Sequence, residues 1–377
     1  MIMTIAFNCW ILRNKNIDGI GTFCIENISR LAQQHPQIHF ALLCDKNFNE
    51  DYFNFPNVTI YRIFPPYRHP ALYLYFLEWT LPRFLKKIKP DVFVGVDGAI
   101  SLRSSCKQLA VIHDLNFEHY PQHLPLRNRL YYKKMFPRFA GKANRIATVS
   151  NYSKTDIVQL YNIPQEKIDV IFSGIKNIDF SKNPDHLQST RQKYTNGNPY
   201  FFFVGTMHQR KNILRLIEAF DLFKKQNPGK PHQLVLCGNI MWNNEALQAK
   251  LKQTTFKKDI ILTGRVTDSE LSLLLSAAEA VTFVPLFEGF GLPIVEAFQA
   301  GVPLICSNTS SLPEVAGDAA LLVDPFNIGE IAHAMERIAD EEQLRNKLVL
   351  KGNERKKMFS WDKTAALLWD SILKTAH

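Results

Sequence analysis

Two glutamates eight positions apart, Glu288 and Glu296, flank a glycine-rich turn in the stretch FVPLFEGFGLPIVEAFQAGVPLICSN, residues 283–308. Gly291 lets the backbone approach a ligand closely, and Pro293 suits the first turn of a helix, where its missing N–H costs nothing. The N–H groups at such a helix start, with the positive end of the helix dipole, favour a phosphate. Glu288 would lie just before the helix and Glu296 about one turn inside it. The stretch predicts a phosphate-binding turn whose carboxylates reach hydroxyl groups of the same ligand.

Two adjacent cations, Arg210 and Lys211, follow an apolar run in the segment YFFFVGTMHQRKN, where Gly205 allows a tight turn after the strand. Ligands of open α/β sheets gather at the carboxyl ends of the strands, so we expect these cations and the Glu288 turn to converge on one crevice. Two cations and a helix N-terminus can hold a diphosphate without magnesium, and we expect no metal site. The alternative is that the glutamates form a solvated helix face and the cations are surface charges.

The first half of the chain offers a smaller set of candidates. His113 and Asp114 end the run QLAVIHD, again where a strand would meet the crevice. The stretch DGIGTF carries Gly19 and Gly21 before a helix, but Cys24 occupies the third glycine position of a dinucleotide fingerprint. An NAD-type site is therefore disfavoured, and a lone histidine is often structural.

These residues are distributed over short apolar runs that alternate with helical patterns along the whole chain. Alternation of this kind predicts parallel strands with crossover helices, hence an α/β class with two doubly wound, Rossmann-like sheets. A polar stretch at residues 175–198 separates the halves and predicts an interdomain linker that contains one helical turn. The domains are then 1–174, joined by a C-terminal helix at about 361–377 that crosses back, and 199–360. The sequence SLPE at 311–314 predicts a capping box.

Three segments, GTMHQRKN, FEGFGLPIVEAFQAGVPLICSNTSSLPEVAGDAALLVDP and IHDLNFEHYP, resemble the retaining glycosyltransferases of family 4, in the subgroup described as mannosyltransferase-like. The resemblance runs through most of the chain and is most specific at residues 283–325. It implies the GT-B fold, in which two Rossmann-like domains face each other across a cleft. The C-terminal half then holds mainly the nucleotide-sugar donor, and the N-terminal half mainly the acceptor.

The resemblance also implies roles for individual residues of the second half. Arg210 and Lys211 would hold the donor diphosphate, Glu288 would contact the sugar hydroxyls, and Glu296 would bind the ribose. Further donor contacts would come from Gly205 and from the turn that contains Gly289, Phe290, Gly291 and Leu292. The chain departs from its relatives at His208, Gln209 and Pro285, where they commonly have Glu, Pro and Ser.

In the first half, the resemblance implies that His113 contacts the donor sugar near the reacting carbon. Gly19 and Gly21 would lie opposite the donor diphosphate, and Asp114 would help to shape the acceptor pocket. We assign His113, Glu288, Arg210 and Lys211 as the catalytic set.

The expected activity is transfer of a hexose, with mannose first, from a nucleotide diphosphate sugar to a glycan or lipid-linked acceptor in cell-surface polysaccharide synthesis. The resemblance implies retention at the anomeric carbon, no cofactor, and GDP-mannose as the first donor to test. The alternatives are a nucleotide-sugar epimerase on the same fold and a nucleotide-sugar-binding protein without catalysis.

A formal net charge of +10 is compatible with several anionic partners, and the motifs favour a nucleotide sugar over nucleic acid. The segment 125–139, PLRNRLYYKKMFPRF, interleaves five cations with aromatic residues, which suits contact with anionic lipid. Its alternative is an amphipathic helix with a solvated basic face. No apolar run is long enough to span a bilayer, and the six cysteines lack a C-x-x-C pair. We expect a soluble cytoplasmic protein that can associate with the inner face of the plasma membrane.

Overall fold

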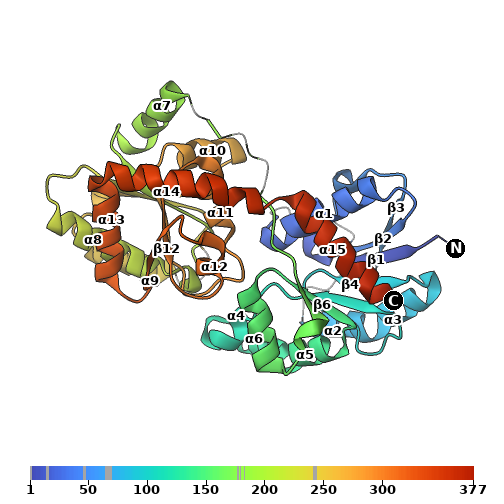
Figure 1. Ribbon diagram of the computed structural model, residues 1–377. Coiled ribbons are helices and arrows are strands. Elements are labelled where there is room, and N and C mark those ends of the chain that lie inside the picture. Colours follow the sequence, from blue (N-terminus) through green and yellow to red (C-terminus); the bar gives the residue numbers. More distant parts are fainter. Residues whose placement is uncertain are drawn as a thin grey trace. The chain divides into compact units, whose positions relative to one another are not determined.

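The chain forms two compact units in the computed structural model (Figure 1), which describes residues 2–13, 17–45, 48–63, 70–175, 178, 180–181, 183–240 and 244–377. The N-terminal unit comprises Met1–Gly174 and Ser360–His377, and the C-terminal unit is Ile175–Phe359. Each unit is built around one parallel sheet with helices. The two Rossmann-like sheets predicted from the strand and helix alternation are confirmed.

The N-terminal unit contains a seven-stranded sheet in the order β3-β2-β1-β4-β5-β6-β7. Its strands are β1 (Thr4–Asn8), β2 (His39–Cys44), β3 (Val58–Arg62), β4 (Val92–Gly95), β5 (Gln108–Val111), β6 (Arg145–Thr148) and β7 (Ile168–Val170). Its α-helices are α1 (Gly19–Gln34), α2 (Pro70–Tyr75), α3 (Leu81–Ile88), α4 (Asn116–His119), α5 (Leu126–Lys142), α6 (Asn151–Tyr161) and α15 (Trp361–Ala376). Short 3-10 turns lie at Trp10–Arg13, Glu50–Phe53, Pro121–His123 and Gln165–Lys167.

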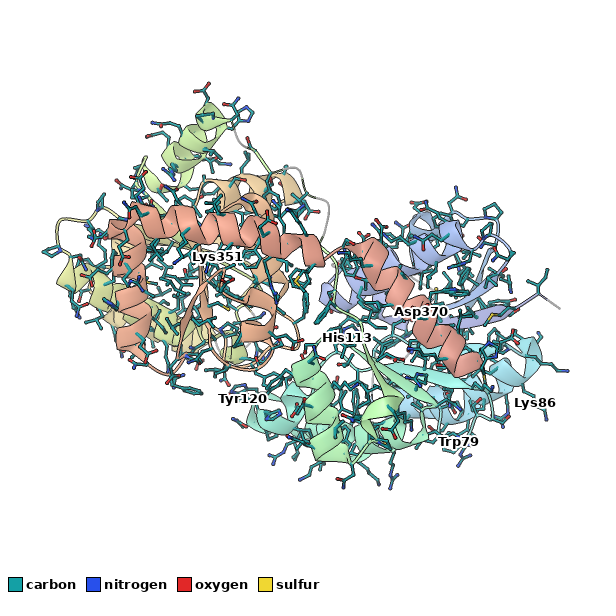
Figure 2. All side chains as sticks on the ribbon, in the orientation of Figure 1. Trp79, Lys86, His113, Tyr120, Lys351 and Asp370 are labelled. Carbon is teal, nitrogen blue, oxygen red and sulfur yellow. The ribbon has the colours of Figure 1, made fainter. Side chains whose placement is uncertain are left out.

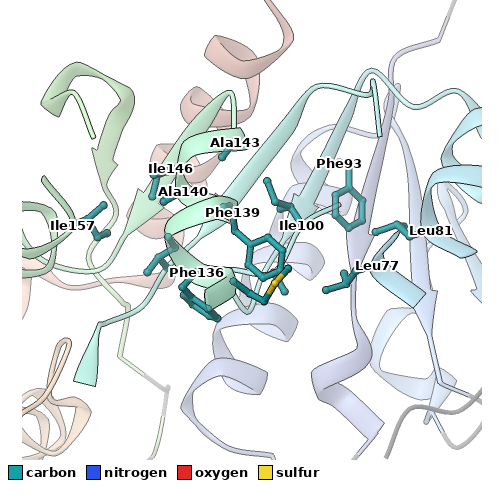
Figure 3. Close-up of a cluster of buried hydrophobic side chains, with 14 of the residues drawn as sticks. Leu77, Leu81, Phe93, Ile100, Phe136, Phe139, Ala140, Ala143, Ile146 and Ile157 are labelled. Atoms are coloured by element: carbon teal, nitrogen blue, oxygen red, sulfur yellow. The ribbon is translucent and has the colours of Figure 1, made fainter. Parts of the chain in front are cut away.

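A large apolar core fills the face of this sheet that α5 covers (Figure 3). Phe136 and Phe139 of α5 belong to one cluster with Phe93 of β4 and Ile146 of β6, and all four side chains are buried. Burying a side chain of this size contributes roughly 1.5 to 3 kcal/mol. The opposite face carries α1 and α15, and α15 also contacts β4, β5 and β6. The C-terminal helix therefore completes the N-terminal unit.

The sequence predicts one continuous helix over residues 72–88, and the structure divides this region. A π-helical turn, Phe76–Thr80, separates α2 from α3, and the N–H of Leu81 donates to the carbonyl of Phe76. Pro82 follows in the first turn of α3 and has no N–H to donate. The extra residue in the turn accommodates this proline without ending the helical path.

The C-terminal unit contains a six-stranded sheet in the order β10-β9-β8-β11-β12-β13. Its strands are β8 (Tyr200–Val204), β9 (Gln233–Cys237), β10 (Ile260–Gly264), β11 (Ala280–Phe283), β12 (Leu304–Ser307) and β13 (Leu321–Val323). Its α-helices are α7 (Pro184–Thr195), α8 (Ile213–Gln226), α9 (Asn244–Gln253), α10 (Asp268–Ser276), α11 (Leu292–Ala300), α12 (Leu312–Ala316), α13 (Ile328–Asp340) and α14 (Glu342–Arg355). Short 3-10 turns lie at Gln209–Lys211, Lys257–Asp259 and Lys356–Met358.

Helices cover both faces of this second sheet. Helix α8 packs against α9 and α13, whereas α11 packs against α10, α12 and α14. A parallel sheet covered in this way is buried on both faces, which explains why β8 and β9 are continuous apolar runs without alternation. The strand order reverses between β8 and β11, which is the switch point where ligands of open α/β sheets bind.

The segment predicted as a linker contains a longer helix than the single turn expected. Helix α7 has 12 residues, and Asn183 caps its start by accepting a hydrogen bond from the N–H of Asp185. Asn196 ends the helix in the left-handed conformation, with φ of 51°. The side chain of Arg191 donates to the carbonyl of Ala277. These contacts join residues 183–196 to the C-terminal unit, because a polar, well-capped helix needs only a few anchors to pack on a surface.

Candidate active site

The loops after β8 and β11, at the switch point of the second sheet, bring the predicted second-half residues together. The β8 loop carries Arg210 and Lys211, and the β11 loop carries Glu288. The N–H of Leu286 donates to the carbonyl of Arg210 over 2.8 Å, which joins the two loops through their backbones. The predicted convergence of these three charges on one site is present in the structure.

Glu288 forms ion pairs with both cations. Its Oε1 atom lies 2.7 Å from Nη1 of Arg210 and 2.6 Å from Nζ of Lys211. Arg210 Nη1 also donates to the carbonyl of Phe287 over 2.6 Å, and Lys211 Nζ lies 4.9 Å from the ring centre of Phe283. The three charged side chains are between 12% and 21% exposed, so solvent screens them little.

The Glu288 carboxylate stays ionised in this setting. Burial alone would raise its pKa, but Arg210 and Lys211 together hold that pKa below the ordinary glutamate value. The three side chains therefore carry a net charge of about +1 at neutral pH. A site of this kind attracts an anion while one of its cations is already neutralised.

Helix α11 begins directly after the Glu288 turn. Gly291 is its N-cap with φ of 94°, and an added Cβ there would lie 2.6 Å from Leu312, so both conformation and space require glycine. Pro293 occupies the first turn of the helix, as predicted. Gly289 and Phe290 are buried beside Glu288, while Leu292 is half-buried. The turn therefore connects Glu288, which contacts both cations, to the N-terminus of a nine-residue helix three residues later.

Glu296 lies in the middle of α11, and its side chain is half-buried. It is one turn beyond the helix start, at the position that the E-x7-E spacing predicts. The two glutamates thus differ in their surroundings, since Glu288 is buried between cations before the helix and Glu296 projects from the helix itself.

The sequence predicts a helix over residues 211–226, but the two cations occupy a 3-10 turn, Gln209–Lys211, and α8 begins two residues later, at Ile213. Nδ1 of His208 accepts the N–H of Arg210 over 3.3 Å, so the departure from the relatives at this position has a local capping function. Asn212 then adopts φ of 61°, which turns the chain into α8. Gly205 has φ of 144°, and its carbonyl would lie 2.1 Å from a Cβ on Gly238. Glycine at these two strand ends allows the loops to approach each other.

His113 lies just after β5 in the N-terminal unit (Figure 2). Its Nε2 is 2.9 Å from the carbonyl of Val96, and its ring meets Phe23 of α1 edge-on with centroids 5.0 Å apart. Since a carbonyl can only accept, Nε2 carries the proton and Nδ1 is an acceptor in the neutral ring. Burial lowers the pKa of His113, although Asp114 and Asp18 oppose this effect. The ring is therefore neutral at pH 7.

The start of α1 lies in the same part of the unit. Asp18 caps the helix by accepting the N–H of Gly21 over 2.9 Å, and Gly19 is the first helical residue. A Cβ on Gly21 would lie 2.8 Å from Ile17, so this glycine allows close packing in the first turn. Phe23 connects this turn to His113, and Asp114 accepts the N–H of Asn116 over 3.0 Å. The structure thus places all four predicted first-half residues in one region of the N-terminal unit.

The capping box predicted for residues 311–314 is wrong. Ser311 precedes α12 in a helical conformation and makes no side-chain cap. Its hydroxyl instead donates to the carbonyl of Glu288 over 2.9 Å, and the hydroxyl of Ser310 accepts the N–H of Glu288 over 3.1 Å. The pattern S-x-x-E predicted a local helix cap, whereas the hydroxyls of Ser310 and Ser311 bond the backbone of the loop after β11. A run of small polar residues directly after a buried strand was the signal available in the sequence.

Across the described residues, no cluster of three or more His, Cys, Asp or Glu side chains could hold a metal ion. The described cysteines are free thiols. Within the same residues, no helix has the length and apolar character needed to cross a membrane.

Two family models match the chain. The model described as Glycosyltransferase Family 4 matches residues 17–176, and the model described as Glycosyl transferases group 1 matches residues 188–355. The first match contains His113 and the second contains Arg210, Lys211, Glu288 and Glu296.

Curated relatives include several mannosyltransferases. The chain is 32% identical over 258 residues to O-antigen chain mannosyltransferase B of Escherichia coli, covering 68% of this chain and 67% of that protein. It is 27% identical over 286 residues to the serotype-specific mannosyltransferase WbdA of the same species, where it spans 33% of the relative's length. The mannosyltransferase-like resemblance predicted from the sequence is confirmed.

Solved structures share the fold over nearly the whole chain. Sucrose-phosphate synthase from Thermosynechococcus elongatus has a TM-score of 0.77 at 19% identity, covering 98% of each chain. HepE from Anabaena, solved in complex with UDP and glucose, has a TM-score of 0.77 at 17% identity, covering 98% of this chain and 99% of its own. Together with the two family matches and the paired parallel sheets, these likenesses show that the chain is a GT-B glycosyltransferase that belongs to family 4.

Proposed function

We propose that this glycosyltransferase transfers mannose from GDP-mannose to a glycan or lipid-linked hydroxyl during cell-surface polysaccharide synthesis, with retention at the anomeric carbon and without a metal ion. The names of the curated relatives support mannose and an O-antigen-type product. They also favour transfer over the epimerase and the non-catalytic alternatives. The observation that carries the proposal is the buried group of Arg210, Lys211 and Glu288 at the start of α11.

In this proposal the donor diphosphate binds Arg210, Lys211 and the N-terminus of α11. The net charge of about +1 on the three side chains attracts the diphosphate, and the helix amides add hydrogen bonds. Glu296 accepts hydrogen bonds from the ribose hydroxyls. Gly205 leaves room for the nucleotide beside Lys211, whose Cε would be 3.8 Å from a Cβ at that position.

Glu288 has two functions in the proposed site. Its Oε1 holds the two cations, and its Oε2 accepts a hydrogen bond from a hydroxyl of the transferred sugar. Binding of the diphosphate then shifts part of the cations' attraction from Glu288 to the phosphates. The carboxylate is thereby released to interact more strongly with the sugar.

The chemical step separates charge, because the bond between the anomeric carbon and the diphosphate oxygen breaks. Arg210, Lys211 and the α11 amides are preorganised where negative charge develops on the leaving phosphate. Losing one such donor typically lowers the rate on the order of 100-fold or more. The acceptor hydroxyl attacks from the same face and passes its proton to the departing phosphate, so no side chain acts as nucleophile.

The N-terminal unit supplies the remaining roles in the proposal. Nδ1 of neutral His113 accepts a hydrogen bond from a donor-sugar hydroxyl near the reacting carbon, while Val96 fixes the ring. The start of α1, in which Gly19 is exposed and Gly21 packs closely against Ile17, contributes its backbone to diphosphate binding, and Asp114 helps to shape the acceptor pocket.

Thermal-shift screening against GDP-mannose, UDP-glucose, ADP-glucose and dTDP-glucose tests the donor. GDP-mannose should give the largest rise in melting temperature, since a ligand at 100 times its Kd stabilises by about 2.7 kcal/mol. A larger rise with another nucleotide sugar would replace GDP-mannose as the donor, and no rise with any of them would defeat the proposal.

NMR of the glycoside product tests stereochemistry, and an inverted anomeric carbon would contradict retention. Turnover that is unchanged after EDTA treatment supports metal independence. Turnover that EDTA abolishes and added Mg²⁺ restores would contradict it.

The proposal includes reversible contact with anionic lipid at the cytoplasmic face of the plasma membrane. All five cations of α5 in the predicted segment are exposed: Arg127, Arg129, Lys133, Lys134 and Arg138. Leu126 and Leu130 of α5 are 67% and 60% exposed.

Exposed aromatic side chains occur on the neighbouring helices. Trp79 is 38% exposed and Tyr75 is 48% exposed, and Figure 2 shows Trp79 and Lys86 at the periphery of the unit. The rings of Tyr73 in α2 and Tyr131 in α5 lie 6.4 Å apart, so α2 and α5 are neighbours. Each cation near an anionic membrane contributes about 1 kcal/mol, while Trp and Tyr favour the interface.

Flotation with vesicles of phosphatidylglycerol and phosphatidylethanolamine tests this contact. The wild-type chain should float at low salt, and the variant Arg129→Glu/Lys133→Glu should not. A matched charge change on α9 of the other unit, Lys250→Glu/Lys252→Glu, should leave flotation intact. Salt-insensitive or absent flotation of the wild type would remove membrane contact from the proposal.

A further inference from the structure

The backbone of residues 284–288, which leads from β11 to Glu288, is held by side chains instead of by regular secondary structure. Each of its five consecutive carbonyl oxygens accepts a hydrogen bond from a different side chain. The pairs, with donor first, are Asn212 to Val284 (3.0 Å), Ser307 to Pro285 (2.7 Å), Thr309 to Leu286 (3.4 Å), Arg210 to Phe287 (2.6 Å) and Ser311 to Glu288 (2.9 Å).

Two amides of the same stretch are bonded as well. The N–H of Leu286 donates to the carbonyl of Arg210, and the N–H of Glu288 donates to the hydroxyl of Ser310. The donors and acceptors named here come from two segments, residues 210–212 after β8 and residues 307–311, which begin at the last residue of β12. We call these two segments the cradle.

The cradle has a clear physical cause. Residues 284–288 are buried, and a buried carbonyl without a hydrogen-bond partner is destabilising because it has lost its bonds to water. A loop beside a ligand site cannot use strand pairing, because its neighbours are also loops. Short polar side chains that reach from both flanking strand ends satisfy the carbonyls and simultaneously fix the path of the loop.

Backbone conformation in the cradle indicates that this arrangement is demanding. Asn212 and Ser310 have φ of 61° and 54°, which side-chain-bearing residues adopt at a cost. Asn212 is also buried, and its Nδ2 atom bridges the carbonyls of Val284 and Pro325, over 3.0 and 2.7 Å. The Asn212 side chain bonds the carbonyl of Val284, and the Ser310 hydroxyl bonds the N–H of Glu288. The strained backbone conformations therefore occur at residues that fix the loop.

We propose that Asn212, Ser307, Thr309 and Ser311 are positioning residues, which fix the backbone of residues 284–288 so that the Glu288 carboxylate is held at the sugar end of the donor. The role of Glu288 in binding a sugar rests on the proposed function, whereas the fixing of the loop backbone by these side chains does not depend on it. A displacement of about 1 Å at a reacting centre can cost 100-fold in rate, which makes a fully bonded loop valuable at this place.

Ser311→Ala is the principal variant, because the Ser311 side chain is fully buried and bonds the Glu288 carbonyl itself. Thr309→Val is a milder second variant that keeps side-chain volume, in case Ser311→Ala folds poorly. Thr195→Val is the matched control. Thr195 is also a fully buried hydroxyl residue of the C-terminal unit, and it donates to the carbonyls of Arg191 and Asn198 outside the site.

Hydrogen exchange of ligand-free protein, read by mass spectrometry, tests the fixing of the loop. Ser311→Ala should speed exchange in the peptide that covers residues 284–291 by about tenfold, since one hydrogen bond of roughly 1.4 kcal/mol is lost. Thr195→Val should leave that peptide unchanged while it lowers the melting temperature. Equal exchange in Ser311→Ala, Thr309→Val and the control would overturn the proposal.

Calorimetry with GDP-mannose and GDP tests the consequence for the sugar. Ser311→Ala should weaken GDP-mannose binding about tenfold and GDP binding less than twofold. In a Glu288→Gln background, Ser311→Ala should produce no further change in the ratio of the two affinities, because its effect acts through Glu288. An unchanged ratio in the wild-type background would overturn the positioning role. If the wild type binds neither ligand while the exchange result holds, the donor assignment fails and the fixing of the loop stands.

Discussion

The Oε1 atom of Glu288 lies within 2.7 Å of Arg210 Nη1 and 2.6 Å of Lys211 Nζ, so one buried carboxylate oxygen holds two cations. In this arrangement each of the three largely buried charges has an oppositely charged partner. Removing one partner is therefore more damaging than removing a compensating pair. The same relationship links stability of the site to its affinity for an anionic ligand.

Lys211→Met should lower both stability and GDP affinity. Glu288 loses one of its two cations and stays buried, which costs about 1 to 3 kcal/mol in the free energy of unfolding. The diphosphate loses one cation, and GDP affinity should fall about tenfold or more. The double variant Lys211→Met/Glu288→Gln should recover part of the stability in urea unfolding, and its GDP affinity should stay below that of Glu288→Gln alone, because one cation of the site is still missing. GDP affinity at the wild-type level in Lys211→Met would contradict the diphosphate role.

His113 should control the acid limb of the pH–rate profile. Burial depresses the His113 pKa below its ordinary value of 6.5. The neutral ring, whose Nδ1 accepts a hydrogen bond, is therefore fully populated above pH 6.5, and it is lost as pH falls through the lowered pKa. His113→Gln keeps a donor for Val96 and an acceptor for the sugar without titrating. We expect lower kcat/KM in this variant and no acid limb from residue 113. The same acid limb in both proteins would assign it to another group.

His232 should make stability depend on pH without affecting the site. It is buried between Phe201 and Phe223, and its ring nitrogens form no hydrogen bond with the described residues. Burial, with Lys230 and Lys224 nearby, lowers the His232 pKa to about 4. In the unfolded state His232 has its ordinary pKa of 6.5, so the unfolded chain takes up the proton at a higher pH than the folded one. The free energy of unfolding is therefore highest above pH 6.5 and falls as pH drops toward 4, by about 3 kcal/mol at most.

The variant His232→Phe isolates this contribution. It should flatten the pH dependence of the free energy of unfolding between pH 6.5 and 4, measured by urea denaturation at each pH. A wild-type slope that persists in the variant would mean that other groups cause it.

Asp169 should anchor the C-terminal helix to the N-terminal unit. It accepts two hydrogen bonds from Arg145, over 2.8 and 2.9 Å, and one from Ser371 of α15, over 2.7 Å. Although burial opposes ionisation, the Arg145 and Ser371 hydrogen bonds hold the Asp169 pKa below its ordinary value. Asp169→Ala should lower stability by about 3 kcal/mol and expose α15 to proteolysis.

Asp370→Ala is the control for this anchor. Asp370 is an exposed residue of α15 (Figure 2), and its loss should change stability by less than about 0.5 kcal/mol. Similar proteolysis of both variants would show that Asp169 does not fix the helix.

The sheets were predictable because parallel strands buried on both faces are short, wholly apolar sequences. The run YFFFV became β8 and QLVLC became β9, with boundaries shifted by few residues. Helix α7 was missed as a helix because its 12 residues are mostly polar, and capping by Asn183 and Asn196 decides its ends. The polar composition of residues 184–195 does not by itself indicate a helix, and the helix becomes predictable only when the two capping residues are considered together.

The charged part of the site was predictable for a different reason. A Gly-x-Pro helix start and adjacent cations after a strand each limit where their side chains can lie, and the switch point brings Arg210, Lys211 and Glu288 together. The cradle was not predictable in this way. Ser311 and Asn212 form hydrogen bonds with carbonyls distant in sequence, and a hydroxyl gives no pattern that distinguishes such a bond from a helix cap.

The most direct test of the proposed site compares Glu288→Ala with Glu296→Ala by calorimetry, using GDP and GDP-mannose on each variant. Glu296→Ala should weaken GDP and GDP-mannose alike, by about tenfold, because a ribose contact is lost. Glu288→Ala should bind GDP at least as well as the wild type, since Arg210 and Lys211 lose their counterion. It should also lose the affinity that the sugar adds, together with turnover. Equal loss of GDP affinity in the two variants would contradict the division of roles between Glu288 and Glu296.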